Sequence, residues 1–311
     1  MKKYSLLILP IAIVLTGYGY WMGMSSTAKS GDLHLTFETT NSRLNIIAFG
    51  DYGTGQEDQF KVFAAAEEFC QKSELDAILL LGDNVYMDGV DSIHDPHWES
   101  VVRKPFSSPC LSTVPLLPIL GNHDYKGNPD AQIEYSKVWN QWHMPHRFYS
   151  ATFGDLLEVI ALDTSYLDFC FDSTRCSGDF LVKRMREKSS RWQIAMGHHP
   201  AHVSLSKHKP GMVGRVLGRV TCGLDAYLGA HNHHLEHLKP KQCQETEYFI
   251  SGAGGASLYP IKSRHEDSLF GLSTFGFLHI EASKESITYA FFNQENKLLY
   301  RYDPLRIASK D

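Results

Sequence analysis

The sequence predicts a mixed α/β fold, and three observations support this class. From Leu44 onward, short apolar runs alternate with segments whose apolar residues recur every three or four positions, which is typical of strands interleaved with helices. After residue 247, strand-like segments follow one another with no helix between the last three, which indicates antiparallel pairing. The length of 311 residues and the hydrophobic content of 43% allow a full core.

Three helices are predicted between the strands. The first covers Glu57–Lys72, where Phe60 and Phe63 fall on one face, the second covers Asp130–Gln141, and a basic helix lies near Leu181–Lys188. The segments RFYSATFG and LLEVIALD are expected to form a hairpin. The other predicted strands, in chain order, are LNIIAFG, DAILLLG, PLLPILG, WQIAMG, DAYLGA, EYFISGAGG, TFGFLHIE, SITYAFFN and KLLYRYD.

The N-terminus differs from the rest of the chain. Lys2 and Lys3 precede an uncharged apolar stretch, Tyr4–Met24, which is typical of an export signal. Its most hydrophobic part, Leu6–Leu15, has the length of a signal-peptide core, but the whole stretch approaches the roughly 20 residues that cross a bilayer. Residues 1–28 are therefore interpreted either as a cleaved signal peptide or as an N-terminal membrane anchor.

Both interpretations predict an exported protein that is periplasmic, secreted or lumenal. Residues 29–43 are expected to form a linker and residues 44–311 a single domain, because no repeat or composition change follows Leu44. The six cysteines show no C-x-x-C spacing, so disulfides are favoured over a zinc site. One pair is predicted, Cys170 with Cys176, because these residues bracket a short loop.

The charge of the chain argues against nucleic acid as a partner. The formal net charge is −5, and no basic stripe is present in the sequence. No obligate protein partner is readable either. A small diffusible substrate is the favoured partner class.

Five predicted strands end in a small residue followed by a polar side chain. In interleaved α/β folds the carboxyl ends of the strands form the ligand crevice, so these residues are expected to converge in space. Each motif alone is weak, since a Gly and Asp turn is ordinary loop chemistry. Together they offer oxygen and nitrogen ligands suited to Fe, Zn or Mn, and more of them than one ion can use. The candidate ligands are Asp51, Asp83, Tyr86, Asn122, His198, His231 and His233.

The motifs GDYG, GDNVY, GNHD, AMGH and AHNH occur in this order along the chain. In this pattern the sequence resembles the purple acid phosphatases of the metallophosphoesterase superfamily, in particular the small mammalian-type tartrate-resistant form. The resemblance extends from Leu44 to the C-terminus. It implies a four-layer sandwich of two mixed β-sheets flanked by helices, with residues 44–311 as the catalytic domain.

The resemblance also implies a binuclear centre of Fe(III) and one divalent ion, which is Fe, Zn or Mn. Asp83 is expected to bridge the two ions, and Tyr86 to bind the ferric ion as a phenolate. The other implied ferric ligands are Asp51 and His233. The other implied ligands of the divalent ion are Asn122, His198 and His231.

The implied activity is that of an exported acid phosphatase, which hydrolyses phosphomonoesters by attack of a metal-bound hydroxide. His123 and His208 resemble the family's outer histidines, which bind the phosphate and protonate the leaving group. The match for His208 needs a one-residue shift, so His202 stays an alternative. Five other histidines are interpreted as ordinary solvated residues, namely His94, His97, His143, His146 and, where it is not the match, His202.

Two other functions stay open on the sequence alone. One is a phosphodiesterase or nucleotide hydrolase of the same superfamily with two divalent ions, against which Tyr86 argues. The other is a metal-containing binding or adhesion protein. The family motif also differs at Ala195 and Ala230, both small replacements, and the loop Ser165–Asp179 aligns poorly. In mammalian-type relatives this loop is acidic and restrains activity, so cutting it is expected to raise turnover.

Overall fold

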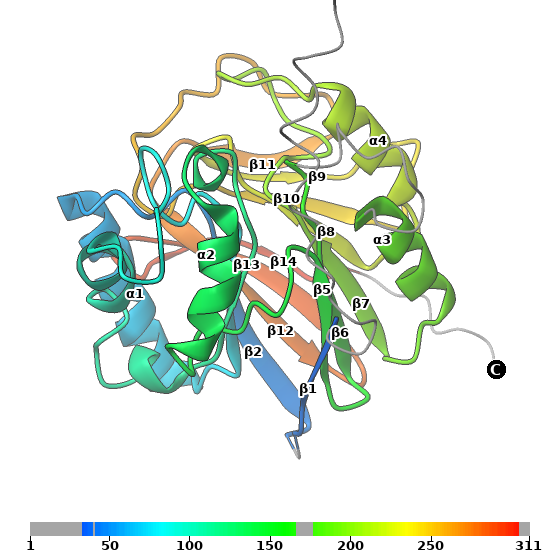
Figure 1. Ribbon diagram of the computed structural model, residues 1–311. Helices are drawn as coiled ribbons and strands as arrows, with labels where there is room; N and C mark the ends of the chain where they lie inside the picture. The colour runs from blue at the N-terminus through cyan, green and yellow to red at the C-terminus, as the bar shows by residue number, and fades with distance from the viewer. Residues whose placement is uncertain (1–32, 40, 166–176, 305–311) are drawn as a thin grey trace, which may run out of the picture. The chain divides into compact units, whose positions relative to one another are not determined.

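A computed structural model of the chain describes residues 33–39, 41–165 and 177–304 (Figure 1). The folded unit begins at Leu33 and contains two mixed β-sheets, one of eight strands and one of six. Short helices pack on these sheets. The predicted α/β class with two mixed sheets is therefore confirmed.

The six-stranded sheet has the order β14-β13-β12-β2-β3-β4. The strands that come first in the chain are parallel to one another, namely β2 (Arg43–Phe49), β3 (Ala77–Leu80) and β4 (Leu116–Pro118). The three strands near the C-terminus are antiparallel, as the lack of intervening helices predicted. These strands are β12 (Gly276–Ser283), β13 (Ile287–Asn293) and β14 (Leu298–Tyr302).

The eight-stranded sheet has the order β1-β5-β6-β7-β8-β10-β9-β11. β5 (Tyr149–Phe153) and β6 (Leu157–Ala161) form the predicted antiparallel hairpin. From β6 the sheet continues in parallel through β7, β8 and β10, and β9 and β11 then add antiparallel strands. The bounds are His34–Phe37 (β1), Trp192–Met196 (β7), Ala226–Gly229 (β8), Leu235–Leu238 (β9), Glu247–Ser251 (β10) and Ser268–Leu272 (β11).

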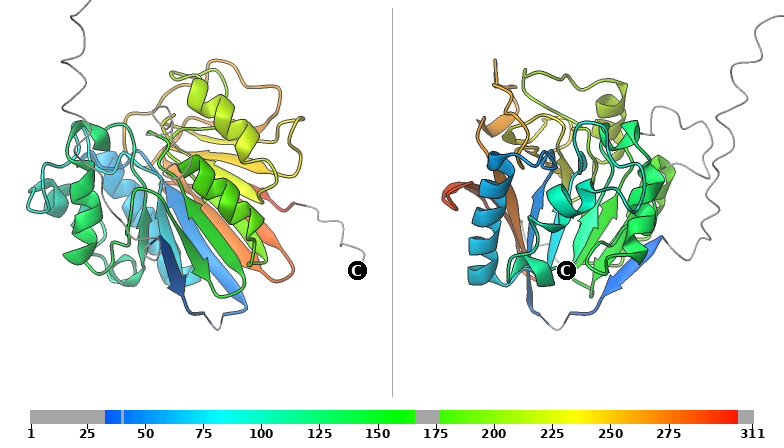
Figure 2. Two further views of the ribbon diagram at one scale, coloured as in Figure 1. Left: turned by 45° about the vertical axis from the view of Figure 1, so that its right-hand side comes forward. Right: turned by 60° about the vertical axis from the view of Figure 1, so that its left-hand side comes forward.

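The two sheets pack face to face, with helices on their outer faces (Figure 2). Between the sheets, the ring of Phe249 on β10 stacks 4.5 Å from the ring of Tyr289 on β13. Phe69 of α1 (Glu57–Ser73) packs on Phe277 and Phe292 of the six-stranded sheet. The eight-stranded sheet is covered by α3 (Ser177–Arg186) and α4 (Met212–Val220), whose Leu181 and Leu217 lie in one buried apolar cluster.

Some elements differ from the expectation. β1 lies within residues 29–43, which were predicted as a linker, and pairs in parallel with β5, so the fold begins before Leu44. Half-buried and exposed residues alternate over only four positions of β1, which is too short a pattern to identify a strand in the sequence. β9, β11 and α4 were not predicted, and α4 contains two glycines, which weaken a helix pattern.

The second helix is shorter than predicted. α2 covers Pro129–Glu134 and continues only as a single 3-10 turn at Tyr135–Lys137. The hydroxyl of Ser136 donates to the carbonyl of Met144 and accepts from its N–H, both at 3.0 Å. This local bonding ties the segment to a following loop, so the backbone leaves the helix although the apolar spacing continues.

Disulfides are present, as the six cysteines predicted. Cys70 pairs with Cys110, and Cys222 pairs with Cys243. The predicted Cys170–Cys176 pair and residues 1–28 lie outside the described residues. Within the described part of the chain, no helix is long and apolar enough to cross a membrane.

Candidate metal centre

Strands of both sheets deliver the predicted ligands to one place. Asp51, Asp83 and Asn122 follow β2, β3 and β4 of the six-stranded sheet, whereas His198 and the pair His231 and His233 follow β7 and β8 of the other sheet. Because these strands run parallel within each sheet, their carboxyl ends meet at one edge. The predicted convergence is therefore present, and the ligand role of each residue stays a prediction.

The backbone is unusual at three of these strand ends. Asp51, Asp83 and His231 adopt positive φ angles of 56°, 53° and 65°. This left-handed region costs a non-glycine residue roughly 1–2 kcal/mol. Such strain persists only where the surroundings impose it, and it gathers at functional sites.

Neighbouring glycines allow the backbone to come close to the carboxylates. A Cβ at Gly121 would collide with Oδ1 of Asp83. A Cβ at Gly252 would lie 2.6 Å from Oδ2 of Asp51. Both carboxylates are thus enclosed by main chain, and both are almost completely buried.

Each carboxylate uses one oxygen for the backbone and presents the other to the centre. Oδ2 of Asp51 accepts the N–H of His231, and Oδ1 of Asp83 accepts the N–H of His123, both at 2.8 Å. The opposite oxygens, Oδ1 of Asp51 and Oδ2 of Asp83, each lie 2.9 Å from Oη of Tyr86. One phenolic proton cannot serve both acceptors at once.

His198 presents a nitrogen lone pair to the same centre. Its Nδ1 donates to the carbonyl of Leu81 at 2.9 Å, which leaves Nε2 as the acceptor in the neutral ring. That Nε2 faces two further acceptors, Oδ1 of Asn122 at 3.2 Å and Oδ2 of Asp83 at 3.5 Å. Nδ1 of His231 lies 3.3 Å from it.

His233 is oriented in the same way on the other side of the cluster. Its Nδ1 donates to the carbonyl of Ser257 at 2.7 Å, so Nε2 is the acceptor in the neutral ring. Nε2 lies 3.3 Å from Oδ1 of Asp51 and 3.2 Å from Oη of Tyr86. Acceptor atoms of several side chains therefore converge on one place, which is the arrangement that holds cations.

The electrostatics also favour positive charge in this cluster. Burial lowers the pKa of His198, but the charge of Asp83 outweighs it and raises that pKa to about 10. Burial opposes ionisation of Asp83, yet His198 holds the pKa of this carboxyl well below its usual range. Burial and the charges of Asp51 and Asp83 raise the pKa of Tyr86. The charges of the buried carboxylates thus keep protons on the neighbouring His198 and Tyr86, and metal cations can take the place of these protons.

A small pocket of about 100 Å³ opens onto the cluster. His123 and His208, the two predicted outer histidines, both contribute to its wall. Nδ1 of His123 donates to the carbonyl of Met87 at 2.6 Å, which leaves its Nε2 free. The residues of the wall are Asp83, Asn122, His123, Lys207, His208, His231, His233 and Tyr259.

The alternative to His208 does not reach this pocket. The centre of the His202 ring lies 4.7 Å from that of Tyr248, and His202 is not part of the pocket wall. His208 is held in place by Asn232, a buried side chain between the two histidines of AHNH. The N–H of His208 donates to Oδ1 of Asn232 at 3.2 Å, and Nδ2 of Asn232 donates to the carbonyl of His208 at 3.3 Å.

Several residues that support the site were missed from the sequence. Asp124 is buried and accepts N–H groups of Gly121 at 2.8 Å and Asn84 at 3.1 Å, so it joins the ends of β3 and β4. Burial and then the charge of Asp83 raise its pKa to about 7. The position of Asp124 in the GNHD motif was the sequence feature that could have identified it. Asn232 likewise stands inside AHNH, whereas nothing in the sequence pattern marks Lys207 or Tyr259.

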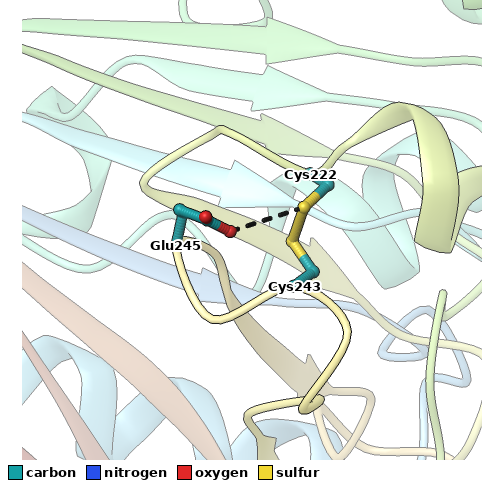
Figure 3. A group of neighbouring side chains, drawn as sticks. All are labelled: Cys222, Cys243 and Glu245. Atoms are coloured by element: carbon teal, nitrogen blue, oxygen red, sulfur yellow. Dashed lines mark hydrogen bonds between the residues drawn. A yellow bond between two sulfur atoms is a disulfide. The ribbon is translucent and has the colours of Figure 1, made fainter.

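A second group of metal-ligand types lies elsewhere (Figure 3). Cys222, Cys243 and Glu245 have ligand atoms within 4.8 Å of one another. The two sulfurs are bonded to each other, however, so no thiolate is available. This group is a disulfide with a carboxylate nearby rather than a metal site.

The fold and the cluster define a class, namely α/β proteins with a candidate metal centre at the carboxyl ends of strands from two mixed sheets. The family model described as calcineurin-like phosphoesterase matches residues 30–235. This chain belongs to that family.

Curated relatives carry phosphatase names. The chain is 28% identical over 295 residues to tartrate-resistant acid phosphatase type 5 of Homo sapiens, covering 83% of this chain and 90% of the relative. It is 24% identical to purple acid phosphatase 4 of Arabidopsis thaliana, covering 86% of this chain and 85% of the relative.

Solved structures share the fold. The anchor in the inner membrane complex of Plasmodium matches with a TM-score of 0.72 and 22% identity, covering 84% of this chain and 88% of that chain. A purple acid phosphatase from yellow lupin seeds matches with a TM-score of 0.65 and 17% identity, covering 86% of this chain and 54% of that chain.

Proposed function

We propose that this protein is an exported acid phosphatase that hydrolyses phosphomonoesters at a binuclear centre of Fe(III) and one divalent ion. The observation that carries the proposal is the position of Tyr86. Its Oη lies 2.9 Å from the inner oxygens of both carboxylates and 3.2 Å from Nε2 of His233. A phenolate among hard oxygen and nitrogen donors suits a ferric ion better than a second divalent ion.

The donor atoms divide into two groups that share Asp83. The ferric ion would be held by Asp51, Asp83, Tyr86 and His233. The divalent ion, Fe, Zn or Mn, would be held by Asp83, Asn122, His198 and His231. When bound, the two ions supply charge neutralisation for the phosphate and activation of a water molecule.

The outer histidines supply the proton chemistry. Because the Met87 carbonyl takes the Nδ1 proton of His123, a protonated His123 offers its Nε2–H to the pocket. That proton can bind a phosphate oxygen and pass to the oxygen of the leaving alcohol. His208, whose backbone is held by Asn232 and which also lines the pocket, orients the phosphate. Neither step needs a phosphorylated side chain.

Two alternatives are distinguished by experiment. A phosphodiesterase or nucleotide hydrolase with two divalent ions would be active and colourless. A binding or adhesion protein would hold metal without hydrolysing a simple aryl phosphate, and the likeness to the Plasmodium anchor concerns the fold alone. The complete set of donors and both outer histidines favour the enzyme.

Export is part of the proposal. Two disulfides in the described residues suit an oxidising compartment. The apolar stretch Tyr4–Met24 would direct the chain there, as a cleaved signal or as an anchor.

The test combines activity with colour. The purified full chain should hydrolyse phenyl phosphate at mildly acidic pH, contain iron, and show a visible phenolate-to-iron absorption band. Tyr86→Phe should remove the band and leave a folded protein. Tyr149→Phe is the matched control, because it removes another buried phenol, whose Oη donates to the Pro118 carbonyl at 2.9 Å. A band that survives Tyr86→Phe would contradict the ferric assignment, and absence of hydrolysis would contradict the enzyme.

A further inference from the structure

Lys207 is a pocket residue for which the proposed phosphatase chemistry has no use. It is part of the pocket wall next to His208, and its side chain is exposed. Its Nζ lies 2.9 Å from Oη of Tyr259 and 4.1 Å from the centre of the tyrosine ring. Tyr259 in turn stacks on His233, with ring centres 3.9 Å apart and planes 14° apart. The ammonium group is therefore held against the wall of the pocket.

The main chain around Lys207 is fixed as well. On one side, the hydroxyl of Ser206 donates to the carbonyl of Pro260 at 3.2 Å. On the other side, Asn232 bonds both the N–H and the carbonyl of His208. An exposed lysine ordinarily loses much side-chain entropy when it binds an anion, and the contacts of the Lys207 ammonium group with Tyr259 lower that loss.

The charge of Lys207 is also available for a ligand. Among the residues that the structure describes, no carboxylate forms an ion pair with Lys207. Lys239, by contrast, is paired with Glu247, and Lys188 lies 3.5 Å from a carboxylate oxygen of Asp225. Lys207 is also the only lysine or arginine among the described residues of the pocket wall.

We propose that Lys207 forms a subsite for a second anionic group, carried by the leaving-group part of the phosphorylated substrate. The inference rests on the proposed function, in which the phosphate occupies the floor of the pocket near Asp83, Asn122 and His231. A pocket of about 100 Å³ has room for little more than that phosphate, so the rest of the substrate lies at the rim where Lys207 stands. The preferred substrates are phosphate monoesters whose alcohol carries a carboxylate or another phosphate.

The test uses two ligands that are not hydrolysed, phenylphosphonate and 3-carboxyphenylphosphonate. Dissociation constants are measured by isothermal titration calorimetry on the metal-loaded full chain. The unmodified protein should bind the carboxylated ligand more tightly, and Lys207→Gln should reduce this preference about fivefold, the size expected for one exposed charge pair. The preference should also shrink as salt is added.

Lys209→Gln is the matched control, because Lys209 is an exposed lysine two positions away that is absent from the pocket wall. It should keep the full preference. The inference is overturned if the unmodified protein shows no preference, or if Lys207→Gln retains it. Hydrolysis of phenyl phosphate by the same preparation tests the proposed function separately. A preparation that does not hydrolyse phenyl phosphate but keeps a Lys207-dependent preference for the carboxylated ligand would contradict the proposed enzyme and support the subsite.

Discussion

Two buried polar clusters of this protein contain the same residue types and differ in their hydrogen bonding. One is the candidate metal centre. The other, called here the Glu247 network, joins β9, β10 and β14 and consists of His237, Lys239, Glu247, Tyr300 and Tyr302. Each cluster holds histidine, carboxylate and tyrosine, so composition alone does not separate them.

In the Glu247 network every acceptor faces a donor. Nε2–H of His237 donates to Oε2 of Glu247 at 3.0 Å, and Nδ1 accepts from the hydroxyl of Tyr300 at 3.0 Å. Oε1 of Glu247 accepts from Lys239 and from the hydroxyl of Tyr302. One consistent set of protons satisfies the whole network, and no cation is needed beyond Lys239.

In the candidate metal centre the acceptors exceed the donors. The Nδ1–H groups of His198 and His233 are committed to backbone carbonyls, so in the neutral rings the Nε2 lone pairs face carboxylate oxygens. No lysine or arginine among the described residues forms an ion pair with Asp51 or Asp83. A count of protons against acceptors therefore separates the candidate metal centre from the Glu247 network.

The largest expected effect is that of Asp83→Asn. Removing the shared carboxylate charge should lower bound metal per chain and reduce kcat/KM for phenyl phosphate about a thousandfold or more. Glu247→Gln makes the same type of change in the other cluster and should keep both the metal content and the activity. Metal analysis and steady-state kinetics measure both effects. Equal losses of metal and activity in the two variants would contradict the distinction between the candidate metal centre and the Glu247 network.

Truncating the structural network should act on stability instead. Glu247→Ala leaves Lys239 and His237 without their shared partner, which is expected to lower the free energy of unfolding by about 3 kcal/mol. Urea unfolding followed by circular dichroism measures this. Metal content of the folded variant should match that of the unmodified protein, and a loss of metal would contradict a purely structural role.

The smallest expected effect is a pH dependence of the stability that Glu247 contributes to the folded protein. Burial opposes ionisation of Glu247, but the hydrogen bonds and charges of His237 and Lys239 outweigh it and lower the pKa below the usual 4.5. The stabilisation by this carboxylate is therefore fully present above pH 4.5, the unfolded value, and is lost as the pH falls through the lower folded value.

Urea unfolding of the unmodified protein and Glu247→Gln over an acidic pH series checks this sign. The stability difference between the two proteins should be constant above the unfolded pKa and shrink below it. A difference that grows on acidification would mean that Glu247 is protonated in the folded state.

The convergence of residues at the candidate metal centre was easier to predict from the sequence than the surroundings of that centre, for a physical reason. Asp51, Asp83 and His198 each follow a short apolar strand and a small residue, so local pattern and sheet geometry suffice to bring them together. Lys207 and Tyr259 meet across 52 positions of chain, and neither belongs to a motif. Such contacts depend on how loops return to the pocket, which periodicity does not encode.

The strands of the fold were likewise predicted where a local pattern marks them and missed where it does not. Strands with continuous apolar runs, such as β3 and β7, were predicted because both faces are buried. The edge strand β1 and the polar strand β9, which carries Glu236 and His237, lack that signal. They are strands because neighbours supply hydrogen bonds, and the sequence of the segment alone carries little of that information.

The most direct test of the account is anomalous X-ray diffraction from crystals of the metal-loaded full chain, with data above and below the iron edge. Two peaks are predicted on either side of Asp83, with iron on the side of Tyr86 and a second ion on the side of Asn122. The Glu247 network should show none. A map without peaks beside Asp83, or with a peak at the Glu247 network, would contradict the claim that unmatched acceptors mark the metal site.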